Sequence, residues 1–344
     1  MTIAHIRTIA ALELTQRLRS VGWYVLLGVY AVLLLGVTAL AFLVYSWGDF
    51  VGAGVYSIVV NFVLLLVVLV SPTLSGNAIN GDREAATLAA VQVTAASTAD
   101  IMLGKLLAAI TTGGAFLLVA VPFLGVSLIG GGANGLVLLV SLVILAVEIV
   151  VVAAIGVGLS GLIARPLFSV ATTYLVVAGL TVGTFIAFAL GGLAVRTEVT
   201  TYSRPYDAAG NVDCDAWESY SYDTPRFDLV WGFLAANPFV VLADATPTTF
   251  TEDGYPIDLF GQIKYGVRSA QQPPESEVRW DEYQCPGYEE DEQYPTAQEV
   301  IDDSVPSWFV GLGIQIVIAG GLFAGAWART RTPARSLPPG TRIA

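Results

Sequence analysis

Charged residues, histidine and cysteine are all scarce in this chain of 344 residues. Only 13% of its residues are charged and 55% are hydrophobic, whereas an average soluble domain carries about 25% charged residues. A water-soluble protein of this size could not bury so much apolar surface, so lipid must surround much of the chain. The single histidine, His5, argues against a histidine-based metal centre and Ser-His-Asp catalysis.

Motifs of nucleotide binding and hydrolysis are also missing. The one Gly-Lys pair, Gly104-Lys105, lacks the glycine five residues earlier and the following Ser or Thr of a phosphate-binding loop. Neither H-E-x-x-H nor G-x-S-x-G occurs. The acidic run Glu289–Glu292 lacks the spaced ligands of a calcium loop and indicates a solvated surface. We expect no catalytic residue, metal site or cofactor in this chain.

Six apolar runs are long enough to cross a bilayer, which takes about 20 residues. The runs are Val21–Tyr45, Val55–Leu74, Ile101–Ile129, Gly135–Ala164, Leu167–Val195 and Ser307–Trp327. The predicted fold class is an all-α integral membrane protein with six transmembrane helices. Its expected parts are a helix over residues 1–20, five spans over 21–195, a large domain over 196–306, a sixth span over 307–328 and a basic tail over 329–344.

The first 20 residues carry apolar side chains at helical spacing, although Arg7 and Arg17 interrupt that face. Long arginine side chains can extend to the headgroups, which favours a helix lying in the inner membrane interface. A simple cytoplasmic extension of the first span is the alternative.

Basic residues flank the spans on one side only. The short loops near residues 47–54 and 130–134 contain no Lys or Arg, and the other flanks contain ten. The positive-inside rule therefore predicts that both termini are cytoplasmic and that residues 196–306 are external.

The predicted external domain holds most of the acidity and both cysteines. Residues 196–306 include 22 acidic and 6 basic residues, a net charge of −16, against −12 for the whole chain. Such acidity offers no footprint for nucleic acid. Cys214 and Cys285 are the only cysteines, and their confinement to one soluble region favours a disulfide in an oxidising compartment over two free thiols.

Leu229–Ala245 is apolar but is interrupted by Asn237-Pro238, so it is too short to span. It fits a helix followed by a second helix that starts at the proline, on or dipping into the outer membrane surface. A buried core helix of the external domain is the alternative.

The segment between the second and third predicted spans contains Gly81-Asp82-Arg83-Glu84-Ala85-Ala86-Thr87-Leu88, and Gly104-Lys105 opens the third span. With Ser160–Pro166 and Asn237-Pro238-Phe239 in this order, the chain resembles the permease subunits of type-2 ABC exporters. Ala86 departs from the glycine that the family often has. The resemblance covers most of the chain, apart from much of Thr197–Phe227 and Phe250–Val305.

The resemblance implies a plasma-membrane exporter with two permease subunits, identical or homologous, above a cytoplasmic ATPase that binds ATP and Mg²⁺. A short coupling helix near residues 82–93 would dock into the ATPase. By residue match, its coupling residues would be Asp82, Arg83, Glu84, Thr87 and Leu88, with Glu84 first. Membrane lipid, and an external lipoprotein on the acidic domain, are further partners that this reading leaves open.

In the family the second and fifth spans line the export path, which points to Asn61, Thr181, Thr184 and Phe185. Glu148 lies in the middle of the fourth span, where a carboxyl group is costly and is a functional hypothesis by default. An ion-coupled transporter or channel that uses Glu148 is one alternative function. A membrane sensor or scaffold with an external ligand- or protein-binding domain is another.

Overall fold

The structure is a computed structural model. It describes residues 2–46, 48, 50–92, 96–132, 134–206, 210–281, 285 and 295–330. The features named above that fall outside these residues include Val93 of the predicted coupling helix, the acidic run Glu289–Glu292, and residues 331–344 of the basic tail.

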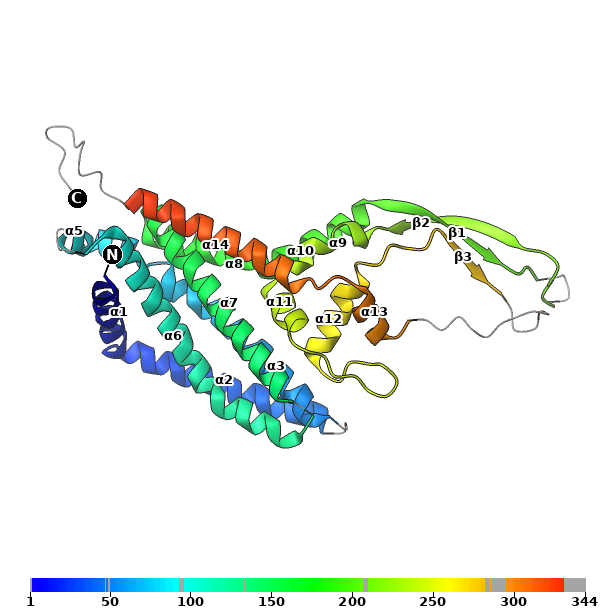
Figure 1. Ribbon diagram of the computed structural model, residues 1–344, viewed down its shortest axis with the longest axis horizontal. Helices are drawn as coiled ribbons and strands as arrows, with labels where there is room; N and C mark the ends of the chain where they lie inside the picture. The colour runs from blue at the N-terminus through cyan, green and yellow to red at the C-terminus, as the bar shows by residue number, and fades with distance from the viewer. Residues whose placement is uncertain are drawn as a thin grey trace.

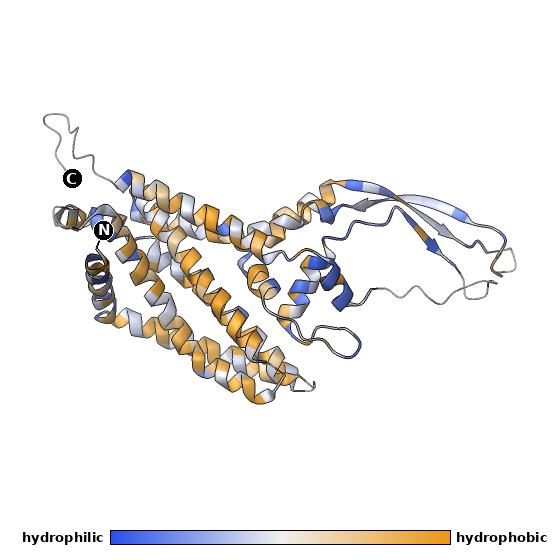
Figure 2. Ribbon diagram, in the orientation of Figure 1, coloured by the Kyte–Doolittle hydropathy of each residue, from blue (hydrophilic) through white to orange (hydrophobic). Residues whose placement is uncertain are grey.

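Six helices in the described residues are long and apolar enough to cross a membrane, so this is a multi-pass membrane protein. The spans are α2 (Val21–Tyr45), α3 (Val51–Ser75), α6 (Thr98–Ser127), α7 (Gly135–Leu162), the run of α8 (Pro166–Ala178), η2 (Gly179–Gly183) and α9 (Thr184–Ala194), and α14 (Trp308–Thr330). Each matches one predicted run to within a few residues. Figure 2 shows apolar residues concentrated in this bundle.

Helix α3 is the most enclosed span, and α7 and α14 cross at close range. Small residues permit that crossing: a Cβ on Gly158 would lie 2.9 Å from the backbone carbon of Leu322, and one on Gly161 would lie 2.6 Å from the Cβ of Ala326. Close backbone approach at small residues is how helices gain packing energy in lipid, where no hydrophobic effect drives them together.

The N-terminal helix α1 (Ile3–Leu18) packs against the start of α6. Gly104 makes this contact possible, because a Cβ there would lie 2.7 Å from the Cβ of Ile9. Ser97 and Asp100 form a capping box at the start of α6, and Asp100 also accepts a hydrogen bond of 3.0 Å from the backbone N–H of Thr2. These contacts fix α1 at the end of the bundle where the N-terminus lies (Figure 1).

The predicted coupling helix is two short helices. Helix α4 (Asn80–Glu84) follows α3 closely, and α5 (Thr87–Gln92) comes after a break at Ala85 and Ala86. Ala86 has φ 56°, a left-handed conformation that interrupts any α-helix. Asp82 and Glu84, at the start of the predicted coupling helix, lie in α4.

Residues 196–306, called the inserted domain below, are mixed α/β, so the all-α prediction holds for the spans and not for this segment. Strand β1 (Arg196–Ser203) lies between β2 (Glu218–Pro225), antiparallel to it, and β3 (Glu277–Trp280), parallel to it. The remaining elements are η1 (Leu128–Gly130), between α6 and α7, and, in the inserted domain, η3 (Phe227–Leu229), α10 (Trp231–Ala235), α11 (Pro238–Ala245), α12 (Leu259–Ser269) and α13 (Ala297–Asp303).

The helices of the inserted domain sit on the end of the bundle opposite the N-terminus, and the sheet projects away from it (Figure 1). The two parts share one hydrophobic core: Leu242 and Phe260 belong to the same buried cluster as residues of α3. The rings of Tyr56 and Phe260 meet edge to face at 6.4 Å, and the backbone N–H of Leu259 donates to Ser57 Oγ at 3.0 Å. The inserted domain is thus packed onto the spans.

Candidate functional site

The α4–α5 segment is held to the bundle by a buried ion cluster. Lys105 of α6 has a side chain 2% exposed and pairs with two carboxylates, Glu13 of α1 and, at 2.6 Å, Asp82 of α4. The two carboxylates keep 21% and 34% of their surface exposed. A buried ammonium needs such partners because its desolvation is costly. This cluster, the Lys105 triad, ties α1, α4 and α6 together.

The five predicted coupling residues divide into anchored and outward-facing groups. Asp82 belongs to the Lys105 triad, and Leu88 is 6% exposed in a cluster with Ile79, Ile101 and Met102. Glu84 and Thr87 are exposed and Arg83 is half-buried. Among the described residues, no ion pair involves Arg83 or Glu84. The segment therefore presents Glu84 outward while Leu88 and Asp82 hold it in place.

Ala86 explains the break between these helices. It is the one non-glycine residue with positive φ in the part of the chain that the structure describes. An L-residue in this conformation is strained, whereas glycine adopts it freely. The position where this chain departs from the resembled family is therefore one where glycine would fit the backbone.

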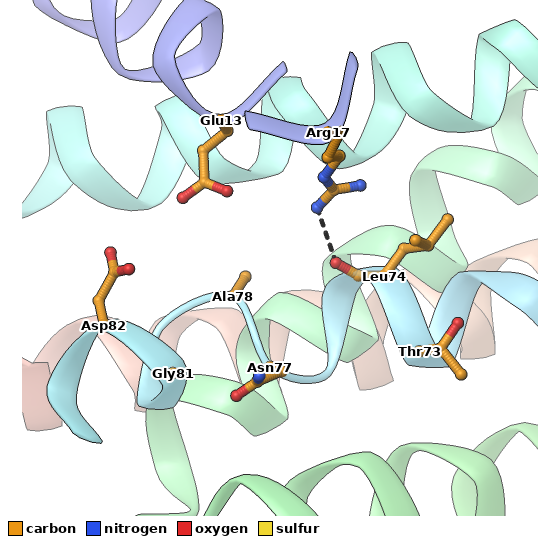
Figure 3. A pocket seen from close by; sticks show the side chains of 8 residues that line it. All are labelled: Glu13, Arg17, Thr73, Leu74, Asn77, Ala78, Gly81 and Asp82. Atoms are coloured by element: carbon orange, nitrogen blue, oxygen red, sulfur yellow. Dashed lines mark hydrogen bonds between the residues drawn. The ribbon is translucent and has the colours of Figure 1, made fainter. Parts of the chain in front are cut away.

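A pocket of about 390 Å³ opens beside the Lys105 triad. Figure 3 shows its lining: Glu13 and Arg17 from α1, Thr73 and Leu74 from the end of α3, Asn77 and Ala78 from the following turn, and Gly81 and Asp82 from α4. The Arg17 guanidinium donates to the carbonyl oxygen of Leu74 at 2.8 Å and to Thr112 Oγ1 at 2.9 Å. Partial burial lowers the pKa of Arg17, although Glu13 opposes this shift.

At the opposite end, the turn between α10 and α11 docks onto the fifth span. Asn237 caps α11, which confirms the predicted helix pair, and its Nδ2 donates to the Thr181 carbonyl oxygen at 2.6 Å and to Thr184 Oγ1 at 3.1 Å. Both threonines border or lie in η2, a π-helical turn. Such turns widen a helix, disturb its hydrogen-bond ladder and often mark functional sites. The turn is thus joined to two predicted pathway residues.

Glu148 lies in the interior of the bundle and is 0% exposed. Gln315 of α14 lies beside its carboxyl group, but neither Glu148 oxygen makes a hydrogen bond to the residues that the structure describes. The Oε1 atom of Gln315 is also unpaired among those residues, while its Nε2 donates to the carbonyl oxygen of Ala236 at 3.1 Å. A carboxyl group in this setting is a candidate to carry a proton, since an ionised group would be uncompensated.

The structure does not join the other predicted pathway residues to this cluster. Asn61 is 8% exposed and its Nδ2 donates to the Ser57 carbonyl oxygen at 2.8 Å within α3. Phe185 is 62% exposed on the outer surface of α9. The two residues therefore differ in burial, and neither forms a hydrogen bond with Glu148 among the described residues.

Sequence reasoning missed a buried pair that anchors the sixth span. Asp244 Oδ1 accepts from Arg268 Nε at 2.8 Å, and Oδ2 accepts from the backbone N–H groups of Ser307 and Trp308 at 2.6 and 2.9 Å. A carboxylate at the start of α14 also matches the positive end of its helix dipole. Asp244 lies in the apolar run 229–245, so a lone carboxylate among apolar residues was the available signal.

The predicted disulfide is present: Cys214 and Cys285 are joined with a Cα–Cα distance of 5.4 Å. Arg204 lies nearby, with its guanidinium 3.6 Å from the ring centre of Trp217 and paired with Asp281 at 2.8 Å. The side-chain hydrogen bonds to Asp281 raise the pKa of Arg204. These contacts join the segment before β2 to the end of β3.

In the described part of the chain, no three His, Cys, Asp or Glu side chains are grouped so that they could hold a metal ion. No protein-family model matches the chain, and no curated protein matches it either. The fold shows a multi-pass membrane protein. Its polar centres include the Lys105 triad at one end and the cluster around Asn237 and Glu148 toward the other.

Proposed function

We propose that this chain is the permease subunit of an ATP-driven exporter of the type-2 ABC class, acting with a second permease subunit and a separate ATPase. The observation that carries the proposal is the α4–α5 segment, where Glu84 faces outward between two spans while Asp82 and Leu88 are anchored. An outward carboxylate can accept charge-assisted hydrogen bonds from a partner. The order of resembling motifs along the chain supports the same assignment.

The anchoring contacts supply a route for motion from an ATPase to the spans. Helix α4 follows α3, and the Lys105 triad joins α4 to α1 and α6. Packed elements move as units because protein interiors are close-packed. A displacement applied at Glu84 would therefore reach α3 and α6 together, which is the role that coupling segments have in this class of exporter.

The proposed orientation places both termini and α4–α5 in the cytoplasm and the inserted domain outside a plasma membrane. The basic flanks of the spans support it through the positive-inside rule. The Cys214–Cys285 disulfide supports it too, since disulfides persist in oxidising compartments. The exposed Phe185 side of the fifth span would then face the second permease subunit or lipid.

The test is an affinity purification of the tagged chain from its native cell in mild detergent, for wild type, Glu84→Ala and the control Glu218→Ala. Glu218 is an exposed carboxylate on β2, at the far end of the molecule. Co-purifying proteins and vanadate-sensitive ATP hydrolysis are measured. We expect an ATPase with wild type and Glu218→Ala, and weaker retention with Glu84→Ala. If no ATPase co-purifies under conditions that keep the complex intact, the proposal is contradicted.

A second candidate is an ion-coupled transporter, which the fully buried Glu148 favours because neither of its carboxyl oxygens has a hydrogen-bond partner among the described residues. It predicts that transport in sealed vesicles continues without ATP, responds to a proton gradient, and is lost in Glu148→Gln. The exporter proposal predicts that ATP is required whatever the gradient.

A further inference from the structure

The pocket beside the Lys105 triad separates opposite charges along its length. Glu13 and Asp82 approach one another at one side, and Arg17 lies at the other (Figure 3). Lys105 contacts one oxygen of each carboxylate, Glu13 Oε1 and Asp82 Oδ2. Two negative charges thus share one ammonium, which leaves an excess negative charge at this side of the pocket.

At the other side, Arg17 forms no salt bridge with the described residues, although the charge of Glu13 acts on it from one turn away. Its two hydrogen bonds go to neutral acceptors, the Leu74 carbonyl and the Thr112 hydroxyl, and no carboxylate of the described residues pairs with it. Guanidinium has five N–H groups, so several remain for a ligand, and phosphate is a preferred partner. The pocket is therefore matched to a zwitterion with a primary ammonium and a phosphate.

The position of the pocket indicates that the zwitterion is a lipid headgroup. Spans α2 and α6 begin and α3 ends at this end of the bundle, which is where phospholipid headgroups meet the protein. Leu12 and Leu18 of α1, which directly adjoin Glu13 and Arg17 in the sequence, are exposed apolar side chains, suited to contact acyl chains.

We propose that this pocket binds the headgroup of a phosphatidylethanolamine-type lipid, with its ammonium at the oxygens of Glu13 and Asp82 that Lys105 does not contact and its phosphate on Arg17. A primary ammonium donates three hydrogen bonds, and the carboxylate oxygens not used by Lys105 accept them. The trimethylammonium of a phosphatidylcholine has no N–H to donate, and a phosphatidylglycerol has no ammonium. This assignment does not depend on the exporter proposal.

The test is native mass spectrometry of the full chain, purified in detergent and titrated with phosphatidylethanolamine, phosphatidylcholine or phosphatidylglycerol of the same acyl chains. We expect wild type to retain the ethanolamine lipid about tenfold better, the effect of one charge-assisted hydrogen bond or more. Glu13→Gln should remove the preference over the choline lipid, and Arg17→Gln should weaken all three. Arg19→Gln, a neighbouring exposed arginine outside the pocket lining, is the control.

A filling variant guards against misfolding as the explanation. Ala78 points into the pocket (Figure 3), and Ala78→Phe occupies it without removing a charge. This variant should retain the ethanolamine lipid no better than the other two lipids, while its thermal unfolding temperature should match that of wild type. Equal retention of the three lipids by wild type, or unchanged retention in Glu13→Gln and Ala78→Phe, overturns the proposal. If soluble phosphoethanolamine displaces the lipid as well as the lipid itself does, the ligand is a soluble zwitterion and the lipid assignment falls.

Discussion

Asn237 Nδ2 donates a hydrogen bond of 2.6 Å to the carbonyl oxygen of Thr181, which joins the inserted domain to the π-helical turn of the fifth span. The adjoining carbonyl of Ala236 accepts from Gln315 of α14, which lies beside Glu148 of α7. Three spans therefore meet at one turn of the inserted domain. A movement of that turn would therefore shift the contacts of both Thr181 and Glu148.

This junction predicts the effect of Asn237→Ser. Serine still caps α11, but it is too short to reach Thr181, so the substitution isolates the docking contact. We expect it to lower the free energy of unfolding by about 1–3 kcal/mol, the cost of unpairing buried polar groups. Asn237→Ala should cost more because the cap is lost too. Unfolding in mixed detergent measures both, and equal stability of Asn237→Ser and wild type would contradict the docking role.

The Lys105 triad predicts that removing its two carboxylates destabilises the protein more than removing its lysine does. In Glu13→Gln/Asp82→Asn the buried ammonium of Lys105 loses both anionic partners, which should cost about 3–5 kcal/mol. Lys105→Met leaves two carboxylates that are 21% and 34% exposed and can be hydrated, so it should cost about 1–2 kcal/mol. The same unfolding assay compares them. A larger loss for Lys105→Met would show that the lysine is not effectively buried.

The left-handed backbone at Ala86 predicts that Ala86→Gly stabilises the protein. The strain of an L-residue at φ 56° exceeds the extra entropy of glycine, and a net gain of about 1 kcal/mol is expected. The control is Ala85→Gly, where φ is −74° and glycine should destabilise by up to about 1 kcal/mol. Thermal unfolding temperatures decide the matter, and the opposite order of the two variants would argue against the helix break.

The disulfide predicts a local loss of stability on reduction. Cys214 and Cys285 are 71 residues apart, and the loop-entropy model gives about 4 kcal/mol for closing such a loop. Cys214→Ser/Cys285→Ser should therefore be cut faster by protease within residues 196–306, with the spans unaffected. Reductant should bring wild type to the same rate and leave the variant unchanged. Identical cleavage of oxidised and reduced wild type would refute the prediction.

Asp258 predicts a pH dependence of stability. It caps α12, and burial raises its pKa above the ordinary value, although hydrogen bonds and Lys264 oppose the shift. The folded state therefore holds this proton more tightly, and the group's stabilising contribution is complete below about pH 4. It is lost as pH rises through the folded pKa. Asp258→Asn keeps a capping side chain and should lack this slope in unfolding measured from pH 4 upward.

Much of the membrane architecture follows from the sequence. The first predicted run, Val21–Tyr45, is α2 to the residue, and the others match because the hydrophobic length of a span is set by the bilayer. The Asn237-Pro238 break predicted the helix pair α10–α11, because a capping Asn and a Pro at the first helical position are local signals. The cysteine pairing was predicted from two cysteines in one soluble segment.

Other elements were not predictable in this way. The sheet was not predicted, although β1, RTEVTTYS, contains β-branched and aromatic residues typical of strands. The rest of the segment is rich in turns and charges, which obscured this signal. The break at Ala86 has no local signal, since alanine is the best helix former.

The sequence by itself determined which segments enter the membrane and which one is acidic and disulfide-bonded, because apolar length, charge and cysteine placement are properties of single segments. Only the tertiary structure decided which polar side chains meet. Lys105 lies 92 residues from Glu13, Asn237 lies 56 residues from Thr181, and Asp244 lies 63 residues from Ser307. Each meeting depends on how helices cross, and no local pattern encodes a crossing between elements so far apart in the chain.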